Sequence, residues 1–266
     1  MGRDYEIFPG SGLPLLIFSV ITTIYYVIKY NLDDYKSNLD DSKSNSMDTV
    51  YFLMYIMILV ITHFFLNLNT SRALCGSNQW ETTFYVTVGP WIIIFGFLYI
   101  GLKTFPSWLM PFSNTIGYGV ALLAGLSETT EKLFKKTENA SKDEIGFLEK
   151  IYTDKSLIIN EITINNFPNF WEKMKGLFRD DVIKDTTNVV QKELLNLVKL
   201  KELTAEYIWY IFAGFLITSI SYNFIIGSSC KKSVQDMQDA HNEHDNESKE
   251  KYESNDLESR VYSMSE

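Results

Sequence analysis

One short stretch of this chain matches a known ion-binding element. Residues 115–119 read TIGYG, and a T-x-G-Y-G loop forms the selectivity filter of potassium channels, where backbone carbonyl oxygens replace the water shell of the ion. The residues concerned are Thr115, Ile116, Gly117, Tyr118 and Gly119. A working filter here would make the protein an ion channel.

The residues around this motif disfavour a filter. Pro106 and Pro111 interrupt the pore helix that should precede it. Only seven apolar-rich residues follow Gly119 before the chain turns polar, whereas a pore-lining helix should begin there. Val120 stands where an acidic residue normally follows the second filter glycine. The alternative is a re-entrant or interfacial loop in which Gly117 and Gly119 form tight backbone turns.

Histidine side chains provide two further candidates for chemistry. His63 is the only histidine, acid or base in the apolar stretch 50–68, and a proton relay would need a partner carboxylate that the apolar stretches lack. His241 and His244 lie among acidic residues in the tail, where a metal site would not be preorganised. The sequence has no Ser/His/Asp set, P-loop or Cys-x-x-Cys pair. We therefore expect no enzyme, no metal site and no cofactor.

Four stretches of the chain are long, apolar and free of charge. Each is close to the roughly 20 residues that a helix needs to cross a hydrocarbon core of about 30 Å. These stretches are residues 13–28, 50–68, 82–102 and 207–226. We expect an all-α polytopic transmembrane protein with four spans in a lipid bilayer. The uncharged segment 104–126 could be re-entrant or a fifth crossing, and the even spread of lysine and arginine leaves the orientation open.

The two cysteines, Cys75 and Cys230, are too few for a disulfide framework and can form at most one bridge. Four crossings would place both cysteines in the same compartment. Five crossings would place them on opposite sides and forbid the bridge. Three glycosylation acceptor sequences, at Asn69, Asn139 and Asn246, matter only where they face a secretory lumen.

The soluble parts of the chain differ in character. From residue 231 onward there are ten acidic and five basic residues and few apolar ones, which predicts disorder. The net charge of −9 argues against nucleic acid as a partner. The predicted organisation is an N-terminus and first transmembrane helix (1–30), a polar loop with the tandem repeat NLDDYKS-NLDDSKS (31–49), the second and third spans with the re-entrant or interfacial segment (50–126), an extramembrane helical region and stalk (127–206), a fourth transmembrane helix (207–228) and a disordered acidic tail (229–266).

Within the extramembrane region, Ser141 and Glu144 predict a capping box that opens a short helix. Residues 156–164 have some strand character. A helical pattern begins near Asp180 and runs without glycine or proline into the fourth span. Its apolar stripe needs a partner, either residues 127–178 or another chain.

Three consecutive blocks carry a resemblance. LCGSNQW at 74–80, the GPW-aromatic span at 89–102 and FPSWLMPFSNTIGYG at 105–119 resemble a membrane segment of the nucleocytoplasmic large DNA viruses, the algal and giant viruses with an internal lipid membrane. The resemblance covers residues 72–126 and brings no catalytic motif. It implies a structural protein of the virion membrane that organises this membrane or anchors it to the capsid, with capsid proteins or copies of itself as partners. The alternatives are an ion channel that uses residues 115–119 and an adaptor that presents its stalk and acidic tail to a cytosolic partner.

Overall fold

The computed structural model describes residues 12–36, 41–137, 142–228 and 230, together with 237–238, 241–242, 244–246 and 248–249. These residues are almost entirely helical, and their nearest approach to a sheet is an isolated bridge between Phe134 and Phe178. The predicted all-α fold is confirmed. Most of the acidic tail predicted to be disordered lies outside the described residues.

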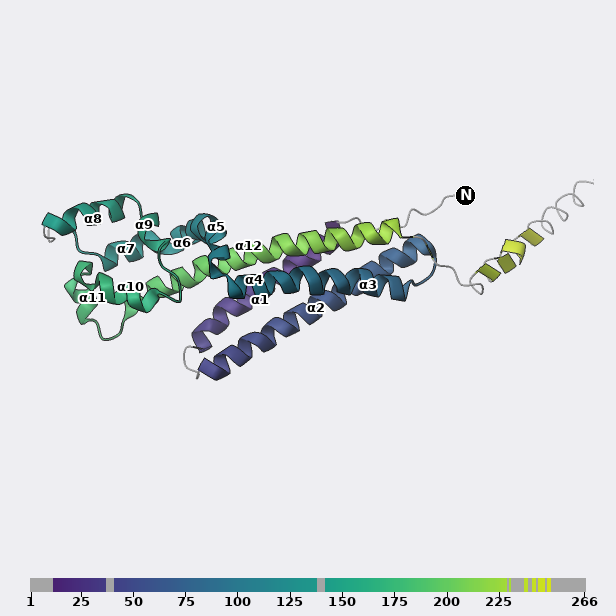
Figure 1. Ribbon diagram of the computed structural model, residues 1–266, viewed down its shortest axis with the longest axis horizontal. Coiled ribbons are helices and arrows are strands. Elements are labelled where there is room, and N and C mark those ends of the chain that lie inside the picture. Colours follow the sequence, from purple (N-terminus) through teal and green to yellow (C-terminus); the bar gives the residue numbers. More distant parts are fainter. Residues whose placement is uncertain are drawn as a thin grey trace, which may run out of the picture.

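Four long helical segments form an antiparallel bundle (Figure 1). Phe18 packs near Phe215, and Lys29 pairs with Glu206, so the first and last segments run in opposite directions. The segments are α1 (Gly12–Lys36), α2 (Asp41–Cys75), the continuous run α3 (Trp80–Pro90), η1 (Trp91–Phe95) and α4 (Gly96–Thr104), and α12 (Val189–Gly227).

The outer surface of the bundle is apolar. Ile93 and Phe97 are 71% and 69% exposed, a pattern that water would penalise and that hydrocarbon favours. Five helical segments are long and apolar enough to cross a membrane: Gly12–Leu32, Met47–Cys75, Trp80–Thr104, Pro106–Leu133 and Val189–Gly227. The protein is therefore an integral membrane protein.

The third span continues through Pro90 without breaking. A single π-helical turn, Trp91–Phe95, follows the proline directly. A wider turn of this kind accommodates the backbone where proline removes a hydrogen-bond donor.

The fifth apolar segment, Pro106–Leu133, lies beside α12 and outside the antiparallel bundle. The indole nitrogen of Trp209 donates to the carbonyl oxygen of Trp108 at 2.8 Å, and Lys132 lies 3.4 Å from Glu193. Figure 1 shows α5 and α6 nearly end-on, so the segment runs across α12. The bundle thus accounts for four crossings, and the segment consists of η2 (Pro106–Leu109), α5 (Met110–Phe112), η3 (Ser113–Gly117), α6 (Tyr118–Ala121), η4 (Leu122–Leu126) and α7 (Ser127–Leu133).

A change of direction in this segment occurs at Gly125. Its φ of 110° belongs to the left-handed region that residues with a Cβ rarely adopt. The uncharged part of the segment therefore ends at a bend, and α7 enters the extramembrane module.

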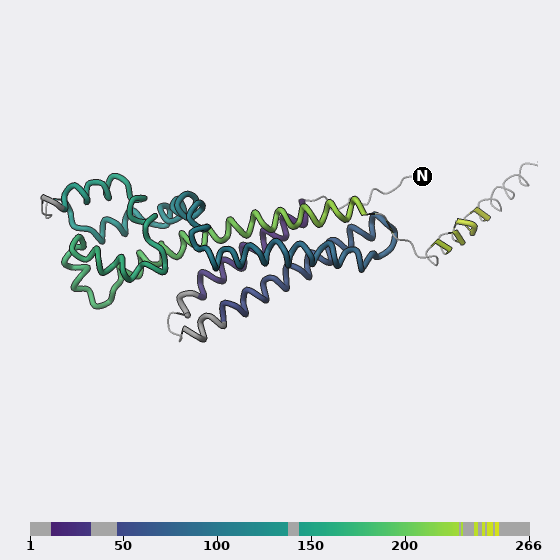
Figure 2. The backbone as a smooth tube through the Cα atoms, viewed as in Figure 1, coloured from purple at the N-terminus to yellow at the C-terminus, as the bar shows by residue number. Residues whose placement is uncertain are grey.

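The module consists of α7 and the short helices that follow it, gathered around the first turns of α12 (Figure 2). Leu194, Leu197 and Val198 of α12 are buried in the same apolar cluster as Leu148 and Phe178. The apolar stripe of the predicted stalk helix therefore packs against residues of the same chain. The other module helices are α8 (Lys142–Thr153), α9 (Ser156–Ile159), α10 (Phe167–Met174), η6 (Lys175–Leu177) and α11 (Asp180–Lys184).

Several local predictions were wrong. The expected strand at 156–164 is the helical turn α9 followed by turns, because one helical turn buries both Ile158 and Ile159 in the module. The expected loop at 31–49 is largely helical, since α1 reaches Lys36 and α2 begins at Asp41. Ser141 of the predicted capping box lies outside the described residues.

The stalk helix also begins later than predicted. The helix that starts at Asp180 stops at Lys184, and Asn188 has a φ of 52°. Asp185 then accepts hydrogen bonds from the backbone nitrogens of Thr187 and Val189, at 2.9 and 3.3 Å. This carboxylate satisfies free donors at the start of α12, which fixes the start of the long helix at Val189.

Candidate functional site

The five residues of the TIGYG motif are helical and lie in η3 and α6. Gly117 has φ −60° and ψ −42°, so the expected tight turn does not form there. The backbone nitrogen of Tyr118 donates to the carbonyl oxygens of Ser113 and Thr115. Carbonyls engaged in this way lie along a helix axis, and a filter needs them turned toward an ion. The predicted loop is therefore corrected to a helix.

Gly117 has a different role, in the packing of two helices. A Cβ atom at this position would overlap the backbone carbonyl oxygen of Lys201 on α12. A Cβ at Gly119, by comparison, would meet nothing within 4 Å. Small residues let helices of membrane proteins approach closely, and of the two motif glycines Gly117 is the one used in this way.

Lys201 lies directly beneath this contact and is 1% exposed. Its ammonium group donates to the carbonyl oxygens of Ile159 and Ile162, at 2.6 and 3.0 Å. The neighbouring Glu202 accepts a hydrogen bond from the backbone nitrogen of Ile164 at 3.0 Å. Together these bonds attach the turn after α9 to α12. No sequence pattern pointed to this role, because a lysine on a polar stalk is normally solvent-exposed.

A charged cavity lies at the module end of the bundle. Each of the four bundle segments contributes one charged residue to its lining: Lys29 from α1, Asp48 from α2, Lys103 from α4 and Glu206 from α12. The cavity has a volume of about 290 Å³. Lys29 and Glu206 form an ion pair at 2.6 Å, with each side chain about one-fifth exposed (21% and 20%).

Two lysine ammonium groups and two carboxylates line this cavity, so its net charge is zero. Such a polar, neutral lining suits water and small polar solutes. Charged side chains are costly within hydrocarbon, so a level at which all four segments carry one marks the end of the membrane-spanning region. The ion pair also joins the first segment to the last. The charged level and the ion pair therefore have a structural role: they hold the four segments together at this end of the bundle.

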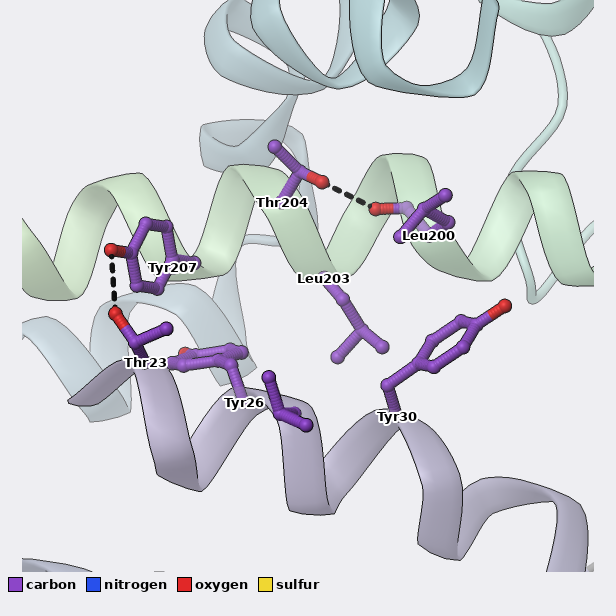
Figure 3. A pocket seen from close by; sticks show the side chains of 8 residues that line it. Thr23, Tyr26, Tyr30, Leu200, Leu203, Thr204 and Tyr207 are labelled. Carbon is purple, nitrogen blue, oxygen red and sulfur yellow. Dashed lines mark hydrogen bonds between the residues drawn. The ribbon is translucent and has the colours of Figure 1, made fainter. Parts of the chain in front are cut away.

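A second cavity of about 290 Å³ opens between α1 and α12 on another face of the same pair of helices (Figure 3). Its walls are almost wholly apolar, with Leu203 and the rings of Tyr26 and Tyr30 turned toward it. At one edge the hydroxyls of Thr23 and Tyr207 lie 3.1 Å apart. Walls of this kind accommodate hydrocarbon groups and provide no chemistry.

His63 lies inside the bundle and is 1% exposed. Its ring packs against Phe18 and Trp91, with centroid distances of 6.2 and 5.4 Å, and its Nε2 atom has no hydrogen-bond partner in the described residues. Nearby, the Asn67 amide donates to Thr87 at 2.9 Å, across α2 and α3. This region holds neighbouring helices together through packing and polar contacts.

Cys75 and Cys230 are joined by a disulfide bond, with their Cα atoms 5.4 Å apart. It connects the end of α2 to the chain just beyond α12, at the end of the bundle opposite the charged cavity. In the tail, His241 lies 3.9 Å from Asp245. Across the described positions, no three metal-binding side chains gather in one place.

Comparison with known proteins adds no family to this description. No family model, no curated protein and no solved structure matches the chain.

Proposed function

We propose that this protein is a structural membrane anchor, in which a four-helix bundle holds a rigid extramembrane module at a fixed distance from the bilayer. The observation that carries the proposal is the continuity of α12. Its 39 residues correspond to about 58 Å, nearly twice the thickness of a hydrocarbon core of about 30 Å. One uninterrupted helix therefore both crosses the membrane and forms part of the module.

The same helix contributes to both apolar cores. Leu194 and Val198 are buried in the module core, whereas Tyr210 and Ile217 are buried in the bundle core. A rotation of the module relative to the bundle would have to disrupt one of these cores. Fixed geometry of this kind suits an anchor or spacer.

The contacts at the boundary between the two parts support this rigidity. Gly117 packs on Lys201, the indole of Trp209 binds the carbonyl of Trp108, and Lys29 pairs with Glu206. Three separate elements are thus attached to α12 within a short length of helix.

The setting we propose is the internal membrane of a large DNA virus particle, and it rests on the resemblance of residues 72–126. In that setting the module would face the capsid shell, and its partner would be a shell protein or another copy of this chain. The buried stalk stripe gives less support to an adaptor that recruits a partner through the stalk. The helical TIGYG segment gives less support to a channel.

Purified particles provide the test. We expect mass spectrometry to find this chain in them, and amine crosslinking to join Lys150, Lys173 or Lys184, all exposed in the module, to a shell protein. Lys249, which follows the opposite end of α12 in the sequence, is the matched control and should give no shell crosslinks. Absence of the chain from particles, or shell crosslinks from Lys249 alone, would overturn the proposal.

A further inference from the structure

The disulfide and the module mark opposite ends of the bundle. Cys75 ends α2 and Cys230 follows α12, and the two helices finish side by side. The module joins the bundle at the other end, where α4 finishes and α12 enters (Figure 1). The two ends of the protein therefore lie on opposite sides of the membrane.

Disulfides persist in oxidising compartments and are rare in a reducing cytosol. The presence of the Cys75–Cys230 bond thus distinguishes the two sides chemically, which the spread of lysine and arginine did not. The disulfide end belongs in an oxidising lumen or its topological equivalent. The module belongs on the reducing side.

We propose that the protein is oriented in this way during its synthesis and that Asn246, beyond Cys230, is a site of N-linked glycosylation. Asn246 is exposed and is followed two positions later by Ser248, which completes the acceptor sequence. This inference is independent of the proposed anchoring function, because it concerns the side of the membrane and not the partner of the module.

Two different observations exclude the other two acceptor sequences. Asn69 lies toward the disulfide end of α2, inside a helix and within the apolar span Met47–Cys75, so it stays close to the bilayer. Asn139 lies in the sequence between α7 and α8, and both of these helices belong to the module on the reducing side. The three sequences thus differ in position relative to the bilayer, and one of them qualifies.

The modification is a group transfer from a lipid-linked oligosaccharide of the lumen. The amide nitrogen of Asn246 forms a bond to the anomeric carbon of the sugar, and the bond between that carbon and the pyrophosphate oxygen breaks. The lipid pyrophosphate leaves with the electron pair, and the amide nitrogen loses one proton. No oxidant or reductant takes part.

The experiment is expression of the full chain in eukaryotic cells, followed by treatment of the membranes with an N-glycosidase. The expected result is a mobility shift equal to one glycan, which Asn246→Gln removes. Asn139→Gln and Asn69→Gln are matched controls and should keep the shift. No shift in the unmodified protein, or a shift removed by Asn139→Gln, would overturn the proposed site.

Protease added outside sealed microsomes tests the orientation separately. The module should be digested, and the disulfide end with the tail should be protected until detergent is added. Digestion of the tail in intact vesicles would overturn the orientation. Neither readout involves virus particles, so failure here is distinguishable from failure of the anchoring function.

Discussion

Gly117 lies against the backbone carbonyl of Lys201, so closely that a Cβ atom at position 117 would overlap the carbonyl oxygen. The glycine of a motif that resembles an ion filter thus serves as a contact point between two helices. This contact attaches the uncharged segment after the third span to the base of the stalk.

Substitution of the two motif glycines should have opposite effects. Gly117→Ala should lower stability by about 1–3 kcal/mol, because the backbone of α12 must move to accommodate the methyl group. Gly119→Ala should raise stability by up to about 1 kcal/mol, because alanine favours the helix and meets open space. Thermal unfolding of the detergent-solubilised protein would measure both. Equal loss from both variants would contradict the specific packing role of Gly117.

Lys201→Met should loosen the turn after α9. The substitution leaves the carbonyl oxygens of Ile159 and Ile162 without the ammonium group that they bind, at a cost of about 1–3 kcal/mol for each buried acceptor left unpaired. Hydrogen exchange should increase at residues 156–164. Lys192→Met, on an exposed position of the same helix, is the control and should leave the exchange unchanged. Similar exchange in both variants would show that Lys201 does not hold this turn.

The disulfide should make stability dependent on reductant. Cys75 and Cys230 are 155 residues apart in the sequence, and a disulfide typically contributes about 2–4 kcal/mol by restricting the unfolded chain. Cys75→Ser and Cys230→Ser should each lower the melting temperature by the same amount as reductant does on the unmodified protein. The double variant should be no worse than either single variant. An unchanged melting temperature in Cys75→Ser would contradict a stabilising role for the bond.

Lys29 and Glu206 should show coupling in a double-mutant cycle. Lys29→Met leaves a largely buried carboxylate without its partner, and we expect a loss of about 1–3 kcal/mol. Adding Glu206→Gln should recover part of that loss, because the unpaired charge is then removed. The measurement is thermal unfolding of the two single variants and the double variant. Additive losses would mean that the ion pair does not join α1 to α12.

Asp185 should give the start of α12 a pH dependence. Hydrogen bonds from Thr187 and from backbone nitrogens lower the pKa of this carboxyl below its usual range. The folded-state pKa then lies below the unfolded one, so the stabilisation is complete above about pH 4 and is lost as the pH falls through the folded pKa. Asp185→Asn should melt earlier than the unmodified protein at pH 7 and at the same temperature in strong acid. A constant difference across this range would contradict the capping role.

The spans could be predicted from the sequence because a run of some 20 apolar residues without charge is rare outside a membrane. The helical stalk could be predicted from the spacing of its apolar residues, such as Leu194, Leu197 and Val198. The position of residues 106–126 could not be predicted, because an uncharged helix suits the membrane interior and its surface alike. Composition indicates whether a segment prefers lipid or water. It does not indicate whether the segment runs through the bilayer or along its surface.

The roles of Lys201 and Gly117 could not be predicted either. The carbonyl oxygens that bind Lys201 come from residues 39 and 42 positions earlier, so no local pattern connects them. Gly117 belongs to a motif that binds ions when its backbone is extended. Here the same residues are helical, and Gly117 packs against α12 instead. The charged cavity was unpredictable for a similar reason, since Lys29, Asp48, Lys103 and Glu206 are far apart in the sequence.

The continuity of α12 has a mechanical consequence. A pull on the module would travel along a single helix through the membrane and arrive, just past its end, at Cys230, which is covalently bonded to Cys75 on α2. Extraction of α12 from the bilayer would therefore drag a second helix with it. A helix held by a covalent bond withstands a larger pull than one held by side-chain contacts alone. Reduction of the disulfide should therefore lower the force needed to extract α12.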